Sequence, residues 1–204
     1  MPPLEAWEKV LIDREASQED VHTSLTCLEC HGGANVPEKD AAHEGLVADP
    51  SQDPQTCGQC HPSHGRAAPG SLHVNLQGYW TDLEARSRPE SKPALEEMMN
   101  NHCTKCHASC GQCHISQPAS GGGGLLEGHA IVARPPMSRT CTACHGSRVG
   151  DEYLGKNEGF LADVHFRQAR MVCTDCHVAE EMHDQINPDA AYRYDGQVTP
   201  SCLS

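Results

Sequence analysis

The sequence predicts a fold of short α-helices joined by irregular segments, with little or no β-sheet. Glycine and proline account for 18 and 14 of the 204 residues, and they interrupt most intervals, as in GGANVPEKD and ARPPMS. No run alternates between apolar and polar residues long enough to indicate a real sheet. Aromatic residues make up 4% of the chain, and two Phe and two Trp cannot anchor a conventional hydrophobic core. Another buried group is therefore expected to organise the fold.

Short helices are expected wherever the five-residue pattern Cys-x-x-Cys-His occurs. The pattern occurs six times, beginning at residues 27, 57, 103, 110, 141 and 173. Two cysteines three positions apart lie on one side of a helical turn, and the histidine follows directly. Only Ala108 and Ser109 separate the third copy from the fourth. The sequence thus places two of these turns almost in contact.

Three further features concern the organisation of the chain. One more helix is expected at Pro93–Asn100, where proline in the first turn is followed by ALEEMM. The tetraglycine at 121–124 predicts a loop within one unit rather than a linker between domains. Residues 1–204 are expected to form a single unit that continues beyond the C-terminus, because Cys202 in TPSCLS resembles the first cysteine of a seventh copy. The alternative for Cys202 is a free thiol.

Cys-x-x-Cys-His is the attachment signature of c-type haem, in which both sulfurs form thioethers with the porphyrin and the histidine binds the iron. The sequence therefore predicts six haem c groups, which would supply the missing buried apolar surface. The cysteines expected to hold them are Cys27, Cys30, Cys57, Cys60, Cys103, Cys106, Cys110, Cys113, Cys141, Cys144, Cys173 and Cys176.

Histidine is the expected ligand on both sides of each iron. The proximal ligands, one from each motif, are His31, His61, His107, His114, His145 and His177. The distal ligands are expected among the eight other histidines, which are His22, His43, His64, His73, His102, His129, His165 and His183. Of these, His129, His165 and His183 are the first choices. His64 and His102 stand too close to a motif to reach the far face of its haem, so each is expected to serve another haem.

Other roles for these residues are less consistent with the sequence. Six cysteine pairs could hold three tetrahedral zinc ions, but zinc sites do not require histidine directly after the second cysteine. A disulfide framework fits poorly with thirteen cysteines in local Cys-x-x-Cys pairs. Methionines such as Met98, Met137 and Met171 are competing axial ligands, which eight spare histidines make unnecessary.

Charge and hydropathy limit the partners. A formal charge of −13 argues against nucleic acid, which requires a basic face. An acidic surface suits cationic redox partner proteins, or serves solubility alone. No segment is apolar enough to span a membrane, and the N-terminus lacks the pattern of a signal peptide. Because haem c is attached after export, we expect a periplasmic or extracellular protein, of which this chain is a mature or trimmed form.

The segments CHASCGQCH, CTACHGSRVGDEYLG and CTDCHVAEEMHD resemble those of the octahaem cytochromes related to tetrathionate reductase, and of extracellular cytochromes that form conducting filaments. The resemblance implies a chain of bis-histidine haems and respiratory electron transfer to periplasmic or external acceptors. The octahaem reductases carry an active haem with lysine in place of the motif histidine, and this chain has no Cys-x-x-Cys-Lys.

Two functions are therefore open. One is electron transfer with every iron six-coordinate. The other is reduction of a small nitrogen or sulfur oxyanion at one open iron. Six histidine motifs and a surplus of spare histidines favour the first. Because the spare histidines outnumber the irons by two, we also expect the haem chain to continue into a neighbouring subunit, as in a filament.

Overall fold

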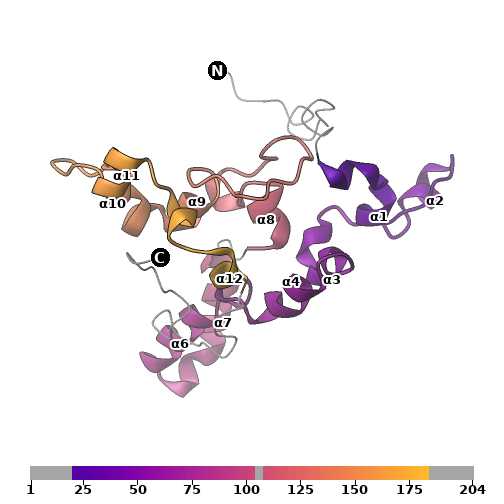
Figure 1. The fold of residues 1–204 in the computed structure, drawn as a ribbon. Helices are drawn as coiled ribbons and strands as arrows, with labels where there is room; N and C mark the ends of the chain where they lie inside the picture. Colours follow the sequence, from indigo (N-terminus) through magenta and orange to yellow (C-terminus); the bar gives the residue numbers. More distant parts are fainter. Residues whose placement is uncertain (1–19, 104–107, 184–204) are drawn as a thin grey trace.

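The computed structural model describes residues 20–103 and 108–183, and the chain in these ranges is helical and irregular (Figure 1). No strand occurs among these residues; Ser116 and Leu125 form an isolated antiparallel bridge. The predicted coarse fold class is thus confirmed. No helix in the described ranges is both long and apolar enough to cross a membrane.

The described helices are short. The α-helices are α1 Cys27–His31, α2 Lys39–His43, α3 Pro54–Gly58, α4 Pro62–Ala67, α5 Leu72–Asn75, α6 Gln77–Ala85, α7 Lys92–Met98, α8 Cys110–His114, α9 Cys141–His145, α10 Asp151–Tyr153, α11 Val164–Ala169 and α12 Ala179–Met182. The 3-10 turns are η3 Val21–Ser24, η4 Pro50–Gln52, η5 Ala68–Gly70, η6 Pro89–Ser91, η9 Ala119–Gly121 and η11 Cys173–Asp175, and the π turns are η7 Met99–Cys103 and η10 Gly146–Gly150.

Local hydrogen bonds explain why helices begin at the motifs. In α1, the Glu29 carboxylate accepts a hydrogen bond from the backbone N–H of Thr26, the residue before the first cysteine. In α8, the Gln112 side chain accepts from the Ser109 N–H in the same way, and Ser109 caps Gln112 in return. In η11, Asp175 accepts from the Val172 N–H. In these three motifs, the residue before the second cysteine therefore accepts a hydrogen bond from the backbone N–H at the start of the turn, which stabilises the turn.

The helix expected at 93–100 is confirmed as α7, which begins at Lys92 and passes through η7 into the third motif. The helix α6 before it was not predicted, because the interval lacks a clear apolar stripe. Leu76, in the left-handed region at φ 55°, separates α6 from α5. Helices α6 and α7 form a hairpin that projects from the rest of the chain (Figure 1), with Lys92 3.3 Å from Glu84. This exposed ion pair contributes little stability.

The glycine loop packs against a motif helix. Gly122, Gly123 and Gly124 have φ angles of +105°, +67° and +89°, which favour glycine, and the Gln117 N–H donates to the Gly124 carbonyl at 2.8 Å. A Cβ atom added at Gly121 would lie 2.8 Å from the Ala143 Cβ in α9. This segment is therefore a tight turn on the fifth motif, as expected of a loop.

The polypeptide forms very little apolar core of its own. Within the described ranges the buried apolar residues are Leu76, Met99, Leu126, Ala130 and Met137, and of these only Met99 is fully enclosed. Large apolar side chains lie at the surface instead, with Phe160 74% and Leu161 77% exposed. The described side chains therefore supply only a small apolar core.

Candidate haem-binding sites

Five of the six motifs lie wholly within the described residues, in α1, α3 and the turn after it, α8, α9 and η11. Cys106, His107, the side chain of Cys103 and Cys202 lie outside them. Each of the ten described motif cysteines carries a free thiol, so the described part contains no disulfide that uses them. The sulfurs are thus available for thioether bonds.

Four motif histidines each face one histidine from outside the motifs. The ring centroids are 6.4 Å apart for His31 and His129, and 6.0 Å apart for His61 and His22. The pair formed by His145 with His73 is separated by 6.2 Å, and that of His114 with His183 by 6.0 Å. Each pair joins distant parts of the chain, so the tertiary arrangement sets the pairing.

These separations fit two imidazoles on opposite sides of one metal ion. A metal–imidazole bond is about 2.0 Å long and the nitrogen lies about 1.1 Å from the ring centroid, so two collinear rings would be about 6.2 Å apart. The four observed values, 6.0 to 6.4 Å, bracket that distance. The residues of these four pairs therefore fit ligation of one iron by each pair, although the His61–His64 separation of 6.1 Å falls in the same range.

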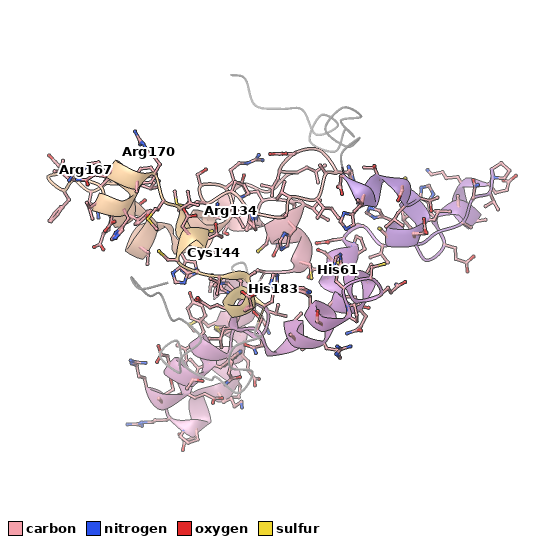
Figure 2. The ribbon with its side chains drawn as sticks, in the orientation of Figure 1. His61, Arg134, Cys144, Arg167, Arg170 and His183 are labelled. Carbon is pink, nitrogen blue, oxygen red and sulfur yellow. The ribbon has the colours of Figure 1, made fainter. Side chains whose placement is uncertain are left out.

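His64 occupies a different position. The His64 ring lies 6.1 Å from the His61 ring and 4.6 Å from the His183 ring. His61 and His183 both lie near the centre of the molecule (Figure 2). The separation of 4.6 Å is too short for an iron between the rings. His64 follows His61 within α4 by three residues, a rise of about 4.5 Å, which is too little to pass around a porphyrin. His22 therefore suits the far side of the His61 site better.

Three predicted distal ligands contact no motif histidine within the described part of the chain. These are His43 in α2, His102 in η7 and His165 in α11, all of which are exposed. The ring of His177 likewise contacts no imidazole of the described residues. His107 lies outside those residues, so its distal partner is not given by this geometry.

Hydrogen bonds hold the histidine rings by Nδ1 and leave Nε2 available for a metal. The His31 Nδ1 lies 2.8 Å from the Val47 carbonyl oxygen, and the His114 Nδ1 lies 2.7 Å from that of Val132. The His177 Nδ1 lies 2.8 Å from the buried Glu181 carboxylate. Such bonds fix the tautomer and the orientation of an imidazole that ligates a metal through its other nitrogen.

The sequence analysis missed the two segments that hold His31 and His114. The backbone N–H groups of Val47 and Val132 also donate to the carbonyls of His31 and His114, at 2.7 and 2.8 Å. Each valine therefore makes two hydrogen bonds to its histidine. The valines stand in the similar segments GLVADP and AIVARP, 16 and 18 residues after their histidines. This repeat was the signal that could have found them.

Burial keeps several candidate ligands neutral, which is the form of histidine that binds metals. Burial, together with the neighbouring His145, His177 and His183, lowers the pKa of His73 to about 4. Burial also lowers the pKa of His145. The His73 residue is nevertheless exposed at its surface.

Two other buried rings lack a hydrogen-bond partner. The Nδ1 atoms of His129 and His183 are enclosed by protein and have no hydrogen bond. Burial lowers the pKa of both histidines. A buried polar group without a partner is rare in folded proteins and points to a role such as metal binding.

Two of the motif cysteines lie where burial favours the neutral thiol. Burial raises the pKa of the Cys113 thiol to about 11 and that of Cys141 to about 12. Zinc binds the thiolate form, which burial disfavours, whereas a thioether sulfur carries no charge. Within residues 20–103 and 108–183, no group of three or more His, Cys, Asp or Glu side chains is placed to hold a metal ion. Each histidine pair supplies two ligands only.

Contacts between cysteines order the motifs in space. The Cys57 thiol lies close enough to Cys110 to lower the pKa of Cys110 to about 7, and the Cys141 thiol lies close enough to Cys173 for the two to interact. The second motif therefore touches the fourth, and the fifth touches the sixth. Cys30 lies near enough to Cys57 to raise its pKa, which links the first motif to the second.

The fourth and fifth motifs are connected in the same way, because the charge of Cys144 raises the pKa of Cys113. The five described motifs thus follow the order first, second, fourth, fifth and sixth. The helices run in the same order across Figure 1, from α1 at the indigo end through α3 and α8 to α9.

No protein-family model, curated protein or solved structure matches this chain.

Proposed function

We propose that this protein is a multihaem c-type cytochrome and, within that class, an electron carrier rather than a reductase. The observation that carries the proposal is the set of four histidine pairs, each with a motif histidine on one side and centroids 6.0 to 6.4 Å apart. When bound, haem c supplies an iron that cycles between the ferric and ferrous states.

The chain itself would perform three tasks. Its motif cysteines would attach the groups, and its four histidine pairs would each supply two ligands to an iron, which would leave no room for substrate at those irons. The cysteine contacts, from Cys57 to Cys110 and from Cys141 to Cys173, hold consecutive attachment sites side by side. A row of adjacent redox sites, four of which are flanked by two histidines, favours relay over catalysis.

We propose location in the periplasm or outside the cell, since haem c is attached there, with redox proteins or external acceptors as partners. The exposed His43 and His165 have no partner ring among the described residues and are available to an iron in a neighbouring subunit. Association into a filament stays a prediction on that basis.

The first test is haem content. The exported full chain is expected to carry six haems, because all six motifs are complete. Pyridine haemochrome titration gives the haem-to-protein ratio, and intact mass under denaturing conditions shows whether attachment is covalent. A mass equal to that of the bare polypeptide, or of a zinc-loaded one, would refute the proposed function.

The second test separates the carrier from the reductase. The resting protein is expected to be entirely low-spin, since described histidines close four of the sites on both sides. Resonance Raman and electron paramagnetic resonance spectra report the spin state of every iron. His177 has no partner ring among the described residues, so a high-spin signal would point first to its site and would favour reduction of an oxyanion there.

A further inference from the structure

The histidines of the candidate sites differ in what accepts their Nδ1 hydrogen bond. His31 and His114 donate to backbone carbonyls, those of Val47 and Val132. Two others donate to carboxylates. The His22 Nδ1 lies 2.6 Å from Asp20 Oδ1, and the His177 Nδ1 lies 2.8 Å from Glu181 Oε1.

Both carboxylates are shielded from water. The Asp20 side chain is 10% exposed and that of Glu181 is 4% exposed. Asp20 is also fixed in place, because its Oδ2 accepts from the Ile131 N–H at 2.7 Å and its Oδ1 from the His22 N–H at 3.0 Å. Hydrogen bonds to charged groups strengthen where water is excluded, so both acceptors act strongly on their imidazoles.

The local sequence encodes the Asp20 arrangement. The segment Asp-Val-His at 20–22 recurs at 163–165, and in both copies the aspartate caps a short helix and accepts from the backbone and ring of the histidine. The His165 Nδ1 lies 2.9 Å from Asp163 Oδ1. The same three residues thus form the same set of hydrogen bonds twice, independently of the surrounding packing.

A carboxylate acceptor changes the metal-binding properties of an imidazole. It withdraws the Nδ1 proton more strongly than a neutral carbonyl does, which raises the basicity of Nε2. A more basic axial ligand stabilises ferric iron over ferrous iron, so hydrogen bonding beyond the ligands is one means by which a protein sets a haem potential.

We propose that Asp20 and Glu181 are positioning residues that lower the reduction potentials of the sites formed by His61 with His22 and by His177. This inference rests on the proposed haem binding. The sites of His31 and His114, whose Nδ1 atoms donate to backbone carbonyls, then have the higher reduction potentials. The second motif lies between the first and the fourth, so its site is expected to have a lower potential than the site on either side. The low-potential site of the sixth motif lies at one end of the row of described motifs.

The experiment compares isosteric variants by redox titration. Asp20→Asn and Glu181→Gln keep the shape and a hydrogen-bonding group but remove the anionic acceptor. In each variant, one component of a spectroelectrochemical titration is expected to move to higher potential. The expected size is a tenfold or larger change in the ferrous-to-ferric ratio at fixed potential, or about 59 mV for one electron.

Asp49→Asn is the matched control. Asp49 lies close enough to His31 for their charges to interact, but it accepts from Ser51 Oγ at 2.6 Å and from Gln52 Nε2 at 2.9 Å, and not from an imidazole. Its replacement removes a nearby charge and leaves every Nδ1 bond intact. A smaller shift in this variant supports the hydrogen-bond mechanism.

Unchanged potentials in both test variants, or equal shifts in Asp49→Asn, would overturn the proposal. The haem-to-protein ratio of the unaltered protein reports on the proposed function separately, so a failure of haem binding is distinguished from a failure of tuning. Asp20→Glu adds a second check, because it retains a carboxylate. Its potential is expected to lie closer to that of the unaltered protein than the potential of Asp20→Asn does.

Discussion

Replacing both cysteines of the fourth motif, Cys110→Ala with Cys113→Ala, is expected to prevent accumulation of the folded protein. This motif lies at the centre of the arrangement, where Cys110 contacts Cys57 and α8 packs against η4. The contact is close, since Ser51 Oγ lies 2.7 Å from Ser109 Oγ and a Cβ at Gly111 would lie 2.4 Å from Ser51 Oγ.

The expected effect is large relative to the stability of a domain. A porphyrin that buries roughly 400 Å² of apolar surface contributes about 10 kcal/mol at about 25 cal/mol per Å². Net stabilities of folded domains are about 5–15 kcal/mol. With only five buried apolar residues in the described part of the chain, little else would compensate for loss of the central group.

The matched control is Cys27→Ala with Cys30→Ala in the first motif. Helix α1 lies towards one end of the molecule (Figure 1), and both of its cysteines are exposed. This variant is expected to yield a folded protein with one haem fewer. Haem content per chain and half-life under limited proteolysis measure both outcomes. Equal protease resistance in the central and peripheral variants would contradict the central role of the fourth motif.

The local structure was predictable from sequence because it depends on a few adjacent residues. The motif turns follow from capping side chains such as Glu29 and Gln112, which stand inside the pattern itself. Helix α7 follows from a proline in its first turn and a run of strong helix formers. The absence of strands from the described ranges agrees with the lack of alternation in the sequence.

The pairing of histidines was not predictable, because it depends on contacts between distant segments. His31 and His129 are far apart in the sequence, and nothing near either residue specifies the other. His129 and His183, two of the first choices, do face motif histidines, whereas His165 faces none in the described part of the chain. Its sequence context differs little from that of His22, so only the tertiary arrangement separates the two.

Replacing His129 with alanine is expected to convert one haem from low-spin to high-spin while the others remain low-spin. His129 is the better target for this purpose than His183. The ring of His64 lies 4.6 Å from that of His183 and is close enough to replace it as a ligand, whereas the only described ring in contact with His129 is that of His31. The open axial position would then bind carbon monoxide in the ferrous state.

His165→Ala is the control, because His165 also precedes a motif but contacts no motif histidine among the described residues. It is expected to leave the site of His31 low-spin. Resonance Raman spectra, together with carbon monoxide titration of the reduced protein, measure the open fraction, expected to be one haem in six for His129→Ala. A fully low-spin His129→Ala protein with normal haem content would show that another residue ligates the iron of His31. An open site confined to this variant would instead assign His129 to that iron, and would show that the spare histidines, rather than the motifs alone, close the sites to substrate.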